Sequence, residues 1–271
     1  MRIPTFIRTS ALAGTMLLSG PAAALPESVT RLIQANGIPA DSISVVMKRV
    51  GAPKALINHQ PTVPRNPASV MKLVTTATAL NLLGPKHRWQ TDALILGHFQ
   101  GDTLTGDLSL RGGGDPWLVI ERFWLLVRQL RERGLTHIRG DLVLDDSLFD
   151  RSAIRTEAID GKSRRSYNTP PNALLVNFGA TSLKLDSRMS RLSVIADPPA
   201  TTVHLTNTVK LDNRSCTGRA RRITLNVDEH QAHTGVLIGG TYPINCGQSI
   251  LRRTLLPHGQ YVYGVFKALW Q

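Results

Sequence analysis

The sequence is poor in aromatic residues and contains almost no cysteine. Aromatic side chains make up 5% of the 271 residues, and only two residues are cysteines. Hydrophobic residues nevertheless reach 42%, which is enough to bury a core, so a disordered chain is excluded. The 22 glycines and 16 prolines recur without a fixed period, which excludes a collagen-like chain. A chain of this length suits one large domain or two ordinary ones.

Acidic residues are also scarce. The chain has 19 Asp and Glu against 32 Lys and Arg, so its formal net charge is +13. Nucleic-acid-binding proteins often carry such a charge. A protein that works beside an anionic cell surface would carry it as well. The charge alone therefore does not choose between these two kinds of partner.

Long hydrophobic runs are missing too. The apolar run at residues 11–18 is shorter than the ~20 residues that cross a membrane as a helix. A basic start with Arg2 and Arg8 precedes it, and the small residues 22–24 follow it, as in a secretory signal peptide. We predict that residues 1–24 are cleaved after Ala24 and that the mature chain is exported to the periplasm without a transmembrane anchor. An N-terminal membrane anchor is the alternative, and export makes nucleic acid an unexpected partner.

The two cysteines, Cys216 and Cys246, are predicted to form a disulfide, because an even pair in an exported protein usually does. Two free thiols and half of a metal site are the alternatives. Neither cysteine has a Cys or His nearby at zinc-like spacing, so no metal and no cofactor are expected. The remaining candidate ligands are histidines scattered along the second half of the chain, and we expect them on the surface: His204, His230, His233 and His258.

Hydrophobic periodicity predicts helices and strands in alternation. Apolar residues at helical spacing predict helices over 27–36, 69–83, 117–133 and 261–271. Alternating and β-branched residues predict strands over 42–50, 54–58, 91–99, 104–111 and 137–144, with further short strands between 172 and 227. The sequence therefore indicates a mixed α/β (α+β) fold.

The sharpest chemical pattern is Ser69-Val70-Met71-Lys72 at the start of the predicted helix 69–83. Positions three apart share a helix face, so the Ser69 hydroxyl and the Lys72 amine should lie within reach of each other. A serine becomes a nucleophile when a neighbouring base takes its proton, and a lysine can be that base. A serine at a helix start also faces backbone N–H groups that can stabilise an oxyanion. An ordinary helix start with Ser69 as a cap is the alternative.

The segment 66–76, Asn-Pro-Ala-Ser-Val-Met-Lys-Leu-Val-Thr-Thr, resembles the nucleophile segment of a known enzyme family. These are the D-alanyl-D-alanine carboxypeptidase/endopeptidases called class C low-molecular-mass penicillin-binding proteins. The resemblance continues in collinear order through residues 83–85, 106–108, 112–116, 140–149 and 167–174. It therefore covers most of the mature chain.

The resemblance implies a penicillin-binding transpeptidase-like (β-lactamase-like) domain with inserted β-rich domains. Residues 25–90 would form the amino-terminal part of that domain, residues 91–250 the inserted domains, and residues 251–271 the start of a return to it. The reaction implied is acyl transfer on peptidoglycan stem peptides, with Ser69 as nucleophile and Lys72 as base. β-Lactams would be trapped at the same serine.

Two further motifs of the family have only look-alikes in this chain. Ser166-Tyr167-Asn168 resembles the Ser-x-Asn that relays the proton, and His233-Thr234-Gly235 approximates the Lys-Thr-Gly that binds the substrate carboxylate. Both fall where the family places its inserted domains, so we interpret them as decoys. The sequence thus predicts an incomplete transpeptidase-like domain that holds Ser69 and Lys72 and lacks the later motifs.

Three other hypotheses remain. In a Ser-x-x-Lys β-lactamase, Ser166 and His233 would converge on Ser69. In a non-catalytic envelope protein, the inserted domain would bind peptidoglycan or protein partners. The third hypothesis is a basic nucleic-acid-binding module. The adjacent pair Asp145 and Asp146 is expected at a turn after a strand rather than as a catalytic acid/base pair.

Overall fold

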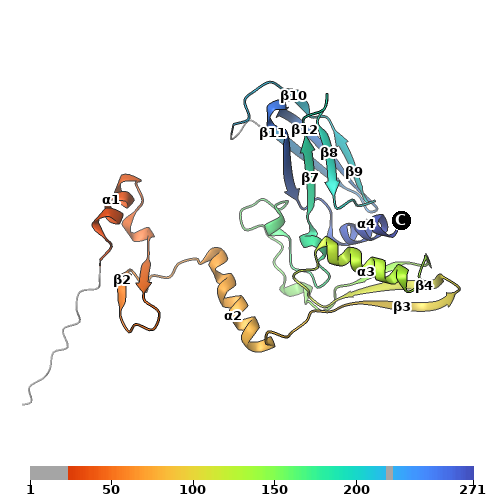
Figure 1. The fold of residues 1–271 in the computed structure, drawn as a ribbon, viewed down its shortest axis with the longest axis horizontal. Coiled ribbons are helices and arrows are strands. Elements are labelled where there is room, and N and C mark those ends of the chain that lie inside the picture. The colour runs from red at the N-terminus through yellow and green to blue at the C-terminus, as the bar shows by residue number, and fades with distance from the viewer. Residues whose placement is uncertain (1–23, 218–221) are drawn as a thin grey trace, which may run out of the picture. The chain divides into compact units, whose positions relative to one another are not determined.

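The computed structural model describes residues 24–217 and 222–271 (Figure 1). The predicted signal peptide lies outside the described residues except for Ala24. The chain divides into two compact units, Met1–Pro85 and Lys86–Gln271. Among the described residues, none of the helices is both long and apolar enough to cross a membrane.

The described residues of the first unit form two α-helices, two short 3₁₀ helices and one hairpin. Its elements are α1 (Glu27–Ala35), the 3₁₀ helix η1 (Ala40–Ser42), β1 (Val45–Lys48), β2 (Ala55–His59), the 3₁₀ helix η2 (Ala68–Val70) and α2 (Met71–Leu83). The two strands pair antiparallel around a turn in which Gly51 takes a positive φ of 77°, a backbone conformation that glycine adopts without strain. This arrangement agrees with the helices and strands predicted from the sequence.

Helix α2 is apolar yet buries nothing. None of its 13 residues is buried, and Leu73 is 72% exposed. A helix with apolar residues on most of its surface is usually found inside a protein. Within the described part of the chain, this helix therefore lacks the packing that its sequence favours.

The second unit begins with a four-stranded sheet. Strand β4 (Thr103–Gly112) lies antiparallel to β3 (Thr91–Gln100) and parallel to β5 (His137–Arg139) and β6 (Leu142–Asp145). Helix α3 (Ile120–Glu132) makes the crossover between β4 and β5. Gly140 lies between β5 and β6, and a side chain is excluded there because a Cβ atom would lie 2.2 Å from the carbonyl oxygen of Gly106.

Two further sheets and a last helix complete the second unit. One sheet has the order β13-β7-β8, and in the other β12 pairs with β9, β10 and β11. Their bounds are β7 (Thr181–Asp186), β8 (Ser193–Asp197), β9 (Val203–Asn207), β10 (Lys210–Asp212), β11 (Arg222–Glu229), β12 (Thr234–Pro243) and β13 (Gln248–Arg253). Helix α4 (His258–Trp270) follows, and the short 3₁₀ helices are η3 (Arg151–Ala153), η4 (Ser166–Asn168), η5 (Val176–Gly179) and η6 (Ile244–Cys246).

One hydrophobic core joins these sheets to the helices. Leu108 on β4, Phe123 on α3, Ile238 on β12 and Val265 on α4 are buried members of the same cluster. Residues 251–271 contribute to this core of the second unit, and their assignment as the start of a return to the first domain stays a prediction. The apolar side chains of α4 recur at helical spacing and find their partners in this core.

The predicted disulfide is present, with 5.1 Å between the Cα atoms of Cys216 and Cys246.

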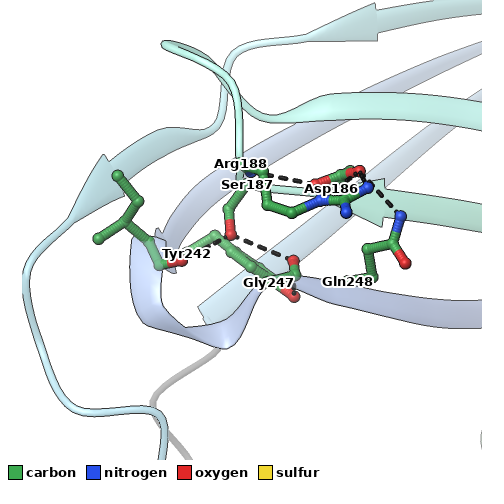
Figure 2. Close-up of polar contacts among 7 residues, drawn as sticks. Asp186, Ser187, Arg188, Tyr242, Gly247 and Gln248 are labelled. Carbon is green, nitrogen blue, oxygen red and sulfur yellow. Dashed lines mark hydrogen bonds and ion pairs between the residues drawn. The ribbon is translucent and has the colours of Figure 1, made fainter.

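A polar network holds the turn after Cys246, as Figure 2 shows. The buried Ser187 hydroxyl lies 2.8 Å from the carbonyl oxygen of Ile244 and 3.1 Å from that of Gly247. Hydrogen bonds, first from Arg188 and also from Gln248, hold the pKa of the Asp186 carboxyl well below its usual range.

Candidate functional site

Ser69 and Lys72 lie together where η2 passes into α2. The Nζ atom of Lys72 donates to the Oγ atom of Ser69 at 3.3 Å. The chain enters this turn through Ala68, which has a positive φ of 44°, and the side chain of Asn66 accepts from the Ala68 N–H at 2.9 Å. The short loop before the helix thus fixes where Ser69 sits.

This arrangement supplies the nucleophile of an acyl-transfer site and a base beside it. The hydroxyl has an amine within proton-transfer reach, whereas the backbone N–H of Met71, the first residue of α2, already donates to the carbonyl oxygen of Ala68. Both side chains are exposed in the described part of the chain.

Comparison with known proteins identifies the family. Residues 25–271 match the model of the D-Ala-D-Ala carboxypeptidase 3 (S13) family. The chain belongs to the S13 family. The match extends over nearly the whole chain and includes the Ser69-x-x-Lys72 segment.

Two curated relatives of this S13 chain carry the same activity in their names. It is 29% identical over 195 residues to the D-alanyl-D-alanine carboxypeptidase of Actinomadura sp. (strain R39), an alignment of 70% of this chain and 36% of the relative. It is 31% identical over 120 residues to the D-alanyl-D-alanine carboxypeptidase DacB of Haemophilus influenzae, 44% of this chain and 25% of the relative. The alignments therefore span about a third or less of these relatives.

Solved structures support the fold. The crystal structure of penicillin-binding protein 4 (dacB) from Haemophilus influenzae matches 84% of this chain and 50% of its own, with a TM-score of 0.64 at 21% identity. The same protein complexed with a novel β-lactam matches with a TM-score of 0.57 at 19% identity, over 83% of this chain and 47% of its own. The S13 chain shares this mixed α/β architecture.

The two look-alike motifs belong to the second unit, whereas Ser69 and Lys72 belong to the first. In the first motif, the Tyr167 hydroxyl donates to Asp160 at 2.6 Å and the Asn168 amide donates to the same carboxylate at 2.7 Å. In the second, the buried Thr234 hydroxyl donates to Gln260 at 2.8 Å. The side chains of Tyr167, Asn168 and Thr234 thus have partners inside the second unit, and the interpretation of the two motifs as decoys stays a prediction.

Asp145 is the last residue of β6 rather than a residue after the strand, and Asp146 follows it just before the turn. The Asp145 carboxylate accepts from the Ser147 N–H at 3.0 Å, as in a turn. Burial raises the pKa of Asp146, but hydrogen bonds from Arg151 and Asn172 outweigh burial, and the pKa lies below its ordinary value.

The histidines are not scattered as the sequence suggested. The rings of His204 and His233 stack with 4.6 Å between centroids, and His230 lies 4.8 Å from His233. The pairing of β9 with β12 and the turn between β11 and β12 bring them together. His258 is partly buried rather than on the surface, and burial lowers its pKa. In residues 24–217 and 222–271, no group of three or more His, Cys, Asp or Glu residues is arranged to hold a metal.

Proposed function

We propose that this chain takes part in serine-type D-Ala-D-Ala carboxypeptidase or endopeptidase chemistry, through an acyl-enzyme at Ser69. The 3.3 Å contact between Lys72 Nζ and Ser69 Oγ, in a chain of the S13 family, carries the proposal. The substrate class is the stem peptide of peptidoglycan, and the compartment is the periplasm. The predicted signal peptide and the basic charge support that compartment.

The proposed reaction has two stages. Ser69 Oγ attacks the carbonyl carbon between the two terminal D-alanines while Lys72 Nζ takes its proton. When the C–N bond breaks, the leaving amine takes a proton and departs as D-alanine. Water then attacks the ester, which frees the shortened peptide and returns the proton to Ser69. A β-lactam would acylate the same oxygen by opening its ring.

The first experiment is covalent labelling with a fluorescent penicillin. The chain without residues 1–24 should be labelled, and Ser69→Ala should abolish labelling, because the ester forms on that oxygen. Absence of labelling in a chain that unfolds cooperatively would overturn the proposal. Ser166→Ala is a control that should label like the parent. A large loss in that variant would instead favour the β-lactamase-type arrangement.

A second candidate function is favoured by the difference in packing between the two units. Helix α2 buries none of its residues, whereas the second unit has a continuous core. The second unit can therefore act as a binding module in the cell envelope whether or not Ser69 reacts.

A further inference from the structure

The second unit contains a cavity that the proposed chemistry does not use. Its volume is about 620 Å³, within the range of small-molecule sites. The start of α3, the 3₁₀ helices η4 and η5, and residues of β7 and β13 surround it; α3 and β7 can be located in Figure 1. Three aromatic and three charged side chains line it: Trp117, Tyr167, Phe178, Glu121, Asp197 and Arg252.

Three aromatic rings in the lining are exposed. Trp117 is 57% exposed, Tyr167 63% and Phe178 40%. The rings of Trp117 and Phe178 meet edge to face with 5.7 Å between centroids. In a chain with so few aromatic residues, three exposed rings at one cavity form an apolar surface that a flat ligand can stack on.

The backbone holds these rings in place. Asn177 and Phe178 both take positive φ values, 45° and 59°, which an aromatic residue rarely adopts. The Asn177 side chain donates to the carbonyl oxygen of Ala180 at 3.0 Å and to the Tyr261 hydroxyl at 3.2 Å, which fixes the turn that presents Phe178. Tyr167 is held by its hydrogen bond to Asp160. The surface is therefore formed before any ligand binds.

The polar groups of the cavity carry both signs of charge. Asp197 forms an ion pair with Lys184 at 2.7 Å. Glu121 has no ion-pair partner among the described residues, and the one hydrogen bond that the Arg252 guanidinium makes to another described side chain goes to the Ser182 hydroxyl, at 3.3 Å. One carboxylate and one guanidinium thus remain able to bind hydroxyl, amide or carboxylate groups of a ligand.

We propose that this cavity binds a carbohydrate. The class that fits best is an oligosaccharide of N-acetylated amino sugars. A sugar ring offers flat C–H faces to the aromatic rings and hydroxyl and amide groups at its edges for Glu121 and Arg252. A nucleic acid would place its phosphates beside the unpaired carboxylate of Glu121, and an apolar peptide would leave Glu121 and Arg252 unpaired. The site supplies a ligand for the second candidate function and does not depend on acylation of Ser69.

The test is binding of the N-acetylglucosamine tetramer to the chain without residues 1–24, by calorimetry and tryptophan fluorescence. We expect saturable binding that Phe178→Gly weakens by about tenfold or more, because it removes one stacking ring. Glycine also accepts the positive φ at position 178, so this variant should fold at least as well as the parent. Trp124→Ala, which removes an exposed ring on α3 outside the cavity, is the matched control and should bind like the parent.

Three outcomes would overturn the proposal. The first is no binding at about 10 mM tetramer. The second is an equal loss in Phe178→Gly and Trp124→Ala. The third is binding in the cavity of a short charged peptide or an oligonucleotide in place of the sugar. Penicillin labelling of Phe178→Gly should equal that of the parent. Sugar binding therefore tests the cavity and penicillin labelling tests Ser69, so one proposal can fail without the other.

Discussion

Lys72 lies one helical turn beyond Ser69, and its Nζ atom donates to the serine Oγ atom at 3.3 Å. The contact follows from the spacing of three residues along η2 and the start of α2. Lys72 can accept the proton of Ser69 only in its neutral form. A substitution that keeps a permanent positive charge at position 72 therefore distinguishes two roles for this side chain, a general base and a cation that only binds.

Lys72→Arg is that change. Arginine keeps the positive charge and stays protonated, so it cannot accept the proton of Ser69. We expect the rate of labelling by fluorescent penicillin to fall by about a hundredfold or more. Lys54→Arg, on the exposed surface of the same unit, should label like the parent. Equal rates for Lys72→Arg and the parent would show that Lys72 is not the base.

The exposed face of α2 gives the second prediction. Leu73→Gln should change the free energy of unfolding by no more than about 0.5 kcal/mol, because this side chain is exposed. Val127→Ala on α3, where the side chain is 2% exposed, should lower it by about 2 kcal/mol. Urea unfolding measures both. A large loss in Leu73→Gln would mean that α2 is buried in solution, for example against a second copy of the chain.

The third prediction concerns the disulfide. Its cysteines are 30 positions apart, so removing the bond should lower the free energy of unfolding of the second unit by roughly 3 kcal/mol. The double variant Cys216→Ser with Cys246→Ser can be compared with the oxidised parent by thermal unfolding. The parent in reductant should behave like the double variant. A reduced parent as stable as the oxidised one would show that the bond does not constrain this part of the chain.

Most helices and strands could be predicted from the local sequence pattern. Where the observed bounds differ from the predicted ones, a specific contact lies at the point of difference. One strand was predicted over 137–144, but β5 and β6 are separate, and Gly140 between them packs against the backbone of Gly106. The helix predicted from 117 begins at Ile120, since the Trp117 N–H donates to Asp115 in a turn. The contact of Gly140 with Gly106 joins residues 34 positions apart and forms only when the chain has folded, whereas the turn at Asp115 is local and starts the helix three residues later than predicted.

The candidate sites differ in the same way. Ser69 and Lys72 could be found because three residues on a helix is a local relationship, and their catalytic role stays a prediction. The cavity beside Trp117 could not be found, because Tyr167, Phe178 and Arg252 come from segments far apart in the sequence. The positive φ at Phe178 has no signal in the sequence, since neither Asn177 nor Phe178 is a glycine.

The last prediction tests whether Tyr167 is fixed at the edge of the cavity. Its hydroxyl donates to Asp160, and this bond is the largest of the effects that lower the pKa of Asp160 from 3.8 to about 2. Because the pKa is lower in the folded state, this contribution to stability is present above about pH 4 and is lost as the pH falls towards 2. Tyr167→Phe should therefore raise the pKa of Asp160, although Asn168 still donates to that carboxylate.

Carboxyl NMR titration of Asp160 measures this shift directly. Tyr263→Phe, an exposed tyrosine on α4, is the control and should leave the pKa of Asp160 unchanged. If Tyr167→Phe also leaves it unchanged, the ring of Tyr167 is not held by Asp160 in solution. One of the three aromatic rings would then be free to move, and the carbohydrate site would have to rely on Trp117 and Phe178 alone.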